Sequence, residues 1–176
     1  SYLPLLQRYT RAVRARNALL KRKPIEEATL DSFTAEVIQL GNQLIAHRHD
    51  LMPALAPRIQ AAHQRIAPGG EELSVAYVPR VKTDFAADLE RIRERERKQG
   101  ATLIGPHRDE LALLLHDRPA ADYASEGQKR TIAIALKIAQ AEHLTEIHGA
   151  PPVLLIVPQL RFPQHLLLLN LIIGHN

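Results

Sequence analysis

The stretch Ala124-Ser-Glu-Gly-Gln-Lys-Arg-Thr-Ile132 is the most informative part of this sequence, because it combines a hydroxyl, a glycine and the start of a helix. Ser125 offers a side-chain oxygen, and Gly127 lets another molecule approach the backbone closely. The apolar pattern that follows predicts a buried helix over residues 128–147. Helix N-terminal ends attract anions, since their free N–H groups point outward and the helix dipole is positive there. The stretch therefore predicts a corner that binds phosphate.

The rest of a nucleotide site is missing from the sequence. Residues 153–157 predict a buried parallel strand, but Pro158 follows it, and residues 147–176 contain no Asp or Glu that could bind a metal ion. Residues 100–105 have the glycine spacing of a phosphate loop, yet Pro106 and His107 stand where Lys and Ser or Thr are required. Phosphoryl transfer needs a metal ion and a phosphate loop, so we expect no catalytic residue for such a reaction in this chain alone.

Composition places the chain among globular proteins. It has 176 residues, of which 45% are hydrophobic, and the absence of cysteine excludes disulfides and thiolate metal sites. No signal peptide opens the sequence, and the apolar run at residues 166–173 is far short of the roughly 20 residues that span a bilayer. We expect a cytoplasmic protein without a membrane anchor.

The net charge of +4 is unevenly distributed. Residues 1–23 contain no acid and seven basic residues, which are Arg8, Arg11, Arg14, Arg16, Lys21, Arg22 and Lys23. Such a block attracts nucleic-acid phosphate, which makes Arg8, Arg11, Arg14 and Arg16 candidate DNA contacts. The alternative, a solvated helix face without a partner, has equal weight at this stage.

Helical periodicity predicts an arm domain over residues 1–68. One apolar stripe runs from Tyr2 to about Arg22, and a second begins after Asp31, a candidate N-cap, and continues to Ile66. The short connection between them predicts an antiparallel hairpin. Two prolines, at positions 53 and 57, should bend or divide the second helix.

Residues 71–157 predict a second domain, followed by a tail at residues 158–176. The expected elements are a strand at residues 73–78, a helix at 83–98 capped by Gly100, strands at 101–104 and 110–115, and a hairpin turn at 116–119. Strands and helices together predict an α/β fold.

Two polar clusters suggest chemistry less strongly. His107, Arg108 and Asp109 offer a base, a cation and a carboxylate, but adjacent side chains diverge, which favours a structural or DNA-facing turn with Arg108 as the phosphate contact. His47 and His49 lie on different faces of a helix, so we expect no metal site there.

Three segments together closely resemble the C-terminal half of the RecF proteins, over roughly residues 1–156. They are Thr102-Leu-Ile-Gly-Pro-His-Arg-Asp109, Ser125-Glu-Gly-Gln-Lys-Arg130 and Pro152-Val-Leu-Leu-Ile156. Upstream, residues 14–20 look like the start of the helical arm of that family. RecF proteins are DNA recombination and repair ATPases related to the SMC, Rad50 and ABC ATPases.

The resemblance implies a partial ABC/SMC-type ATPase head, made of strands and a signature helix, with an α-helical hairpin arm. In the intact family ATP and Mg²⁺ are the cofactors, the phosphate loop lies in an N-terminal portion, and an ATP-dependent homodimer forms. The signature motif of one subunit contacts the γ-phosphate held by the other, which assigns this role to Ser125, Glu126, Gly127 and Gln128. The implied partners are single-stranded or gapped DNA and recombination-mediator proteins, in replication, recombinational repair and the SOS response.

The sequence departs from the family after residue 156. RecF-like proteins have an Asp-Asp pair where this chain has Val157-Pro158, and the tail resembles nothing in the family, which suggests a gene fragment or a reading-frame change. Two alternatives remain open. One is an SMC- or Rad50-like structural ATPase piece, although the hairpin arm of about 40 residues after Pro24 is too short for a long coiled coil. The other is a non-enzymatic basic helical DNA-binding or interaction module in which Ser125 is only a helix cap.

Overall fold

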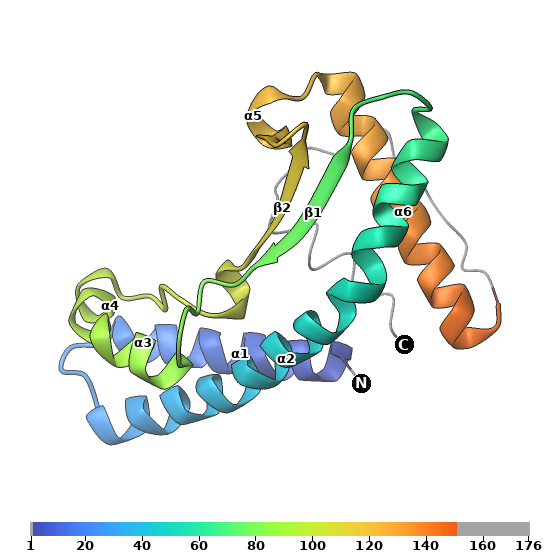
Figure 1. Cartoon of the computed structure of the whole chain (residues 1–176). Helices are drawn as coiled ribbons and strands as arrows, with labels where there is room; N and C mark the ends of the chain where they lie inside the picture. The colour runs from blue at the N-terminus through green and yellow to red at the C-terminus, as the bar shows by residue number, and fades with distance from the viewer. Residues whose placement is uncertain (1, 151–176) are drawn as a thin grey trace. The chain divides into compact units, whose positions relative to one another are not determined.

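The computed structural model describes residues 2–150, apart from the side chain of His148 (Figure 1). Helices predominate, beside one small sheet, which confirms the expected mixture of helices and strands. The elements are α1 (Tyr2–Leu20), α2 (Glu27–Ile66), β1 (Leu73–Val78), α3 (Phe85–Arg91), α4 (Arg93–Gln99), η1 (Pro106–Arg108), β2 (Glu110–Leu115), β3 (Arg118–Pro119), α5 (Ala120–Tyr123) and α6 (Glu126–His148). The predicted strand at residues 153–157 and the tail at 158–176 lie outside the described residues.

The chain forms two compact units, each made of two segments. Of the described residues, 2–48 and 79–109 form the first unit, and 49–78 and 110–150 form the second. The long helix α2 contributes to both.

In the first unit, α1 and the N-terminal half of α2 form the predicted antiparallel hairpin. Near the start of α1, the hydroxyl of Tyr2 accepts a hydrogen bond from Arg48 at 3.2 Å. Near its end, Arg16 donates to Thr34 at 2.8 Å. The start of α1 therefore contacts a later residue of α2, and the end of α1 contacts an earlier residue of α2. Only helices that run in opposite directions make this pair of contacts, so the predicted hairpin is confirmed.

The boundaries of α2 correct two expectations. The helix begins at Glu27, so Asp31 lies inside it and is not the N-cap. The reason is burial of Leu30, which is only 1% exposed and packs with Leu19 and Leu20. This packing stabilises a helix that begins before Leu30. The helix also runs through both Pro53 and Pro57 without interruption, so of the two expected outcomes, a bend or a division, the division does not occur.

The predicted helix at residues 83–98 forms as two helices, α3 and α4, which meet at Ile92. Asp84 caps α3 by accepting a hydrogen bond from the N–H of Ala87 at 2.9 Å. Gly100 ends α4 with a left-handed φ of 64°, which confirms the predicted C-cap.

Residues 101–104 do not form the predicted strand, because side chains bind their backbone instead of a neighbouring strand. The N–H of Thr102 donates to Oδ1 of Asn17, and the N–H of Leu103 donates to a carboxylate oxygen of Glu96, both at 2.7 Å. Once these donors are satisfied, they are no longer open to pair with a sheet.

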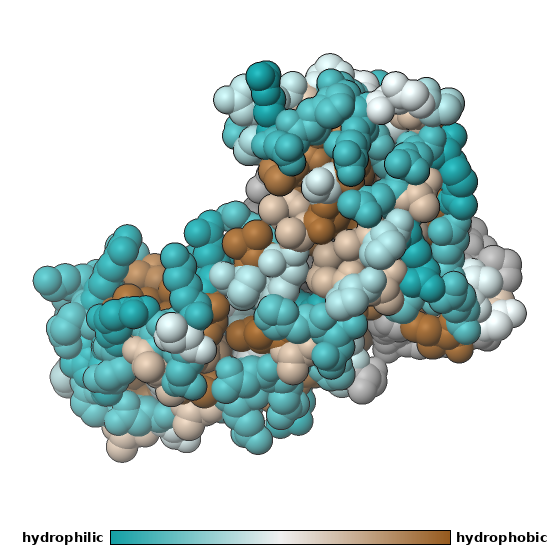
Figure 2. Space-filling model, viewed as in Figure 1, coloured by the Kyte–Doolittle hydropathy of each residue, from teal (hydrophilic) through white to brown (hydrophobic). Residues whose placement is uncertain are grey.

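The second unit contains an antiparallel sheet in the order β1-β2-β3. Leu73 of β1 lies opposite Leu115 of β2, and Leu111, Leu113 and Leu115 are buried on one face. Apolar side chains are also visible over β1 and β2 on the face shown in Figure 2. Val78, at the end of β1, is 39% exposed.

The predicted hairpin turn follows β2. His116 and Asp117 have positive φ values of 45° and 61°, as a two-residue turn between antiparallel strands requires.

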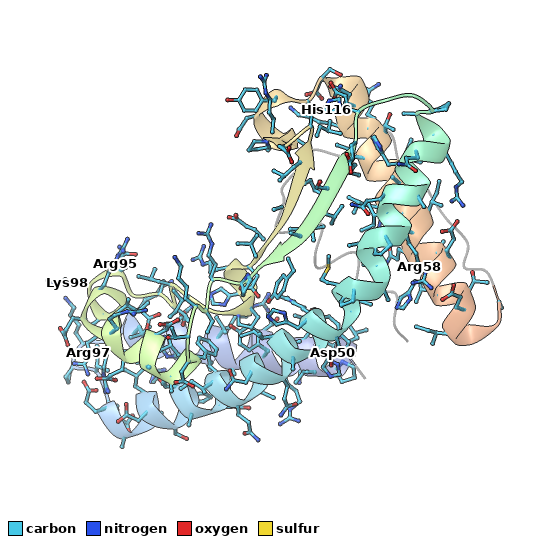
Figure 3. All side chains as sticks on the ribbon, viewed as in Figure 1. Asp50, Arg58, Arg95, Arg97, Lys98 and His116 are labelled. Atoms are coloured by element: carbon cyan, nitrogen blue, oxygen red, sulfur yellow. The ribbon has the colours of Figure 1, made fainter. Side chains whose placement is uncertain are left out.

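Two ion pairs, Arg58 with Glu146 and Arg65 with Glu142, join the C-terminal half of α2 to α6 (Figure 3). The sheet and this helix pair position the start of α6.

Candidate functional site

Ser125 and Gln128 form a capping box at the start of α6. The Oγ atom of Ser125 accepts a hydrogen bond from the N–H of Gln128 at 3.2 Å, and the side-chain oxygen of Gln128 accepts one from the N–H of Ser125 at 2.7 Å. Such reciprocal bonds fix the geometry of a helix N-terminus. Ser125 is thus a helix cap, and this leaves its hydroxyl proton available to a further acceptor.

The corner formed by Ser125, Glu126 and Gly127 is exposed. Among the described residues, a Cβ atom added to Gly127 would meet only Oγ of Ser125, at 3.9 Å. The fold of this chain therefore does not require a glycine at position 127, but an incoming molecule that must approach the backbone would. The carboxylate of Glu126, which would repel an anion, pairs with Nζ of Lys129 at 3.3 Å.

A hollow of about 420 Å³ opens directly beside this corner. Its lining includes Glu71, His116, Arg118, Tyr123 and Gln128. The guanidinium of Arg118 lies 5.5 Å above the ring of Tyr123, and His116, labelled in Figure 3, lies 3.7 Å from a carboxylate oxygen of Glu71. Glu71 also accepts a hydrogen bond from the side-chain nitrogen of Gln128 at 2.7 Å.

The arginines of α1 divide into two groups. Arg8, Arg11 and Arg14 are exposed and have no hydrogen bond or ion pair among the described residues. Arg16 is only 2% exposed, and its guanidinium pairs with Glu96 at 2.6 Å while also donating to Thr102. A buried and paired guanidinium cannot reach a DNA backbone, so we remove Arg16 from the surface candidates.

The turn at residues 105–109 presents Arg108 to solvent while its neighbours are fixed. Gly105 has φ 124°, and a Cβ atom there would come within 2.6 Å of the hydroxyl of Tyr9. Asp109 is buried and forms an ion pair with Arg48 at 2.8 Å. His107 contacts the hydroxyl of Tyr9 at 2.7 Å, and burial lowers the pKa of its imidazole. His107 and Asp109 therefore have separate structural partners, whereas the side chain of Arg108 is exposed.

The structure does not gather the other polar cluster into a metal site. His47 packs edge-on against Tyr2, and His49 packs against Tyr77. Within residues 2–150, no group of three or more His, Asp or Glu side chains is placed to hold a metal ion. No helix in this part of the chain is long and apolar enough to cross a membrane.

Sequence reasoning missed Glu71, Arg48 and Glu96. Glu71 contacts Gln128 across 57 positions of sequence, and Glu96 pairs with Arg16 across 80. No local pattern marks residues whose partners are this distant, so periodicity could not have found them.

Comparison with known proteins identifies the relatives of the chain. No family model matches it. RecF of Symbiobacterium thermophilum is 38% identical over 168 residues, which cover 89% of this chain and 45% of the relative. RecF of an Anaeromyxobacter species is 40% identical over 161 residues, covering 84% and 43%. This chain is a relative of RecF and matches its C-terminal part.

Solved RecF structures agree with this assignment. A structure of the recombination mediator protein RecF with ATP, from the RecFOR pathway, superposes with a TM-score of 0.77 at 27% identity and covers 89% of this chain. The corresponding RecF–ATPrS structure gives a TM-score of 0.76 at 27% identity and covers 86%. The chain spans 45% and 44% of these two structures, so it corresponds to less than half of a RecF protein. The likeness confirms the expected fold, a partial ATPase head with a helical region.

Proposed function

We propose that this chain supplies the signature side of an ATP site in a RecF-like protein of DNA replication and recombinational repair. The observation that carries the proposal is the exposed corner from Ser125 to Gly127 at the N-terminus of the 23-residue helix α6. RecF relatives whose structures contain ATP support ATP as the nucleotide.

Ser125 and Gly127 each have a role in this proposal that their geometry fits. The hydroxyl of Ser125 donates its proton to an oxygen of the γ-phosphate, while one of its two lone pairs accepts from the N–H of Gln128. Gly127 offers its backbone N–H, which has no partner among the described residues. The positive end of the α6 dipole adds attraction for the anion. In this proposal Mg²⁺ would be held on the phosphate-loop side of the site, by the other protomer.

The division into a helical arm at residues 1–68 and a head at residues 71–157 is part of the proposal. With Val157 and Pro158 in place of an acidic pair, the chain binds its share of the nucleotide but does not hydrolyse it alone. It works inside an ATP-dependent dimer, in the cytoplasm.

DNA is the proposed macromolecular partner, as a single-stranded or gapped duplex delivered with recombination-mediator proteins. The exposed side chains of Arg8, Arg11 and Arg14 supply phosphate contacts on α1, and Arg108 supplies another from its turn. The charge of the three α1 arginines is not neutralised within the described residues, in contrast to that of Arg16.

Ser125→Asp tests the nucleotide role without removing the helix cap. Aspartate is as good an N-cap as serine, but it places a negative charge where the γ-phosphate would lie. The chain would be mixed with a separately expressed N-terminal RecF half that bears the phosphate loop, and association would be measured with a non-hydrolysable ATP analogue. We expect Ser125→Asp to weaken nucleotide-dependent association by about 100-fold.

Ser125→Thr is the matched control, because threonine keeps both the hydroxyl and the cap. It should associate nearly as the unsubstituted chain does, and circular dichroism should show α6 intact in both variants. Association of Ser125→Asp at the unsubstituted level would refute the nucleotide role. It would favour the module in which Ser125 is only a cap.

A further inference from the structure

Glu71 lies two residues before β1 and contacts Gln128, next to the corner formed by Ser125, Glu126 and Gly127, which is called the nucleotide corner below. Its carboxylate accepts a hydrogen bond from the side-chain nitrogen of Gln128 at 2.7 Å. The second oxygen lies 3.7 Å from Nδ1 of His116 at the hairpin turn. The carboxylate is therefore held from two sides, although its side chain is 43% exposed.

This contact decides which way the amide of Gln128 faces. A side-chain amide has one donor end and one acceptor end, and a carboxylate can only accept. Glu71 therefore draws the nitrogen of Gln128 toward itself and turns the oxygen toward the N–H of Ser125, which it accepts at 2.7 Å. In the opposite orientation, two donors would face each other at Ser125 and an acceptor would face the carboxylate.

We propose that Glu71 is a positioning residue for the nucleotide corner, acting on Ser125 through the orientation of Gln128. The proposal rests on the proposed function, since the phosphate is the group for which Ser125 is positioned. Fixing the Ser125 N–H fixes the backbone of the cap, and hence the direction in which its hydroxyl points. The carboxylate of Glu71 acts through side chains, since its contacts are with Gln128 and His116.

A reversal of donor and acceptor provides the test. Glu71→Lys replaces the acceptor by a donor, which favours the flipped amide of Gln128 and breaks the bond to the Ser125 N–H. Because one capping bond contributes about 1 kcal/mol, we expect the Ser125 amide proton to exchange with water roughly fivefold faster in NMR of the full chain. Adding Gln128→Glu to Glu71→Lys should restore the original rate within about twofold, since the new carboxylate accepts from both the introduced ammonium group and the Ser125 N–H.

Glu72→Lys is the matched control, because it makes the same charge change one residue away without touching Gln128. Equal exchange rates for Glu71→Lys and Glu72→Lys, or no rescue by the second substitution, would overturn the proposal. These measurements need no nucleotide, so they are independent of the Ser125→Asp experiment on which the proposed function depends.

The functional half of the proposal has its own readout. In the mixture with the phosphate-loop half, Glu71→Lys should weaken association with the ATP analogue about threefold to fivefold, whereas Glu72→Lys should leave it unchanged. If exchange at Ser125 changes while association does not, Glu71 organises the cap but does not position it for phosphate, and the proposal is wrong. If Ser125→Asp also has no effect, the proposed function fails as well.

Discussion

Two helices of the first unit carry arginines at helical spacing, and they use them in opposite ways. On α4, Arg93 and Arg97 both pair with Glu27, and Arg93 also pairs with Asp31. On α1, Arg11 and Arg14 have no such partners among the described residues. Figure 3 labels Arg95, Arg97 and Lys98 on α4. Both helices are basic by composition, but they differ in pairing. Arg93 and Arg97 of α4 are paired with acids, whereas the charges of Arg11 and Arg14 of α1 are not neutralised by described residues.

This difference shows that a basic helix is a candidate DNA contact when no acidic side chains lie close enough to pair with its arginines. An exposed ion pair adds little to stability, but it satisfies the guanidinium and lowers its attraction for phosphate. Within residues 2–150, the exposed arginines of α1 form no hydrogen bond or ion pair. Contact with DNA phosphate is the role that we propose for them.

The largest expected effect is a difference in the free energy of unfolding between substitutions of two arginines on α1. Arg16→Ala leaves Glu96 buried without its partner, so the free energy of unfolding should fall by about 3–5 kcal/mol. Arg14→Ala should change it by no more than about 0.5 kcal/mol, since the side chain of Arg14 is exposed. Urea denaturation followed by circular dichroism measures both, and similar losses would break the comparison.

The next effect concerns DNA. Reversing Arg11 and Arg14 to Glu should weaken binding to single-stranded or gapped DNA by at least about tenfold, and should reduce the slope of log K against log salt by about 2. Reversing Arg93 and Arg97 on α4 is the matched control, with a smaller expected loss because these charges are already paired. Fluorescence anisotropy over a salt series gives both quantities. Binding that is unchanged on reversal at α1 would remove this helix from the proposal.

The smallest expected effect comes from removing the acid that pairs with the arginines of α4, so that these arginines become unpaired like those of α1. Glu27→Gln removes the carboxylate that Arg93 and Arg97 share, and should cost less than about 1 kcal/mol because all three side chains are partly exposed. If neutralisation is what distinguishes the helices, the variant should bind DNA slightly more tightly at low salt. A gain that persists at high salt would point to a cause other than charge.

Local features of the fold could be predicted, and most were. The hairpin of α1 and α2, the turn after β2 and the C-cap at Gly100 all follow from spacing and turn chemistry within a few residues. The failures arose where distant groups intervened. Burial of Leu30 moved the start of α2, and the side chain of Asn17 satisfied the backbone that was expected to form a strand at Thr102.

The candidate site shows the same division. The sequence by itself determined that Ser125 begins a helix and that Gly127 follows it, because a cap depends on residues within four positions of chain. Only the tertiary structure decided that this corner is exposed, that Arg16 is buried against Glu96, and that Glu71 orients Gln128. Those outcomes depend on which distant side chains the folded backbone brings within hydrogen-bonding reach, and periodicity along the chain carries no record of them.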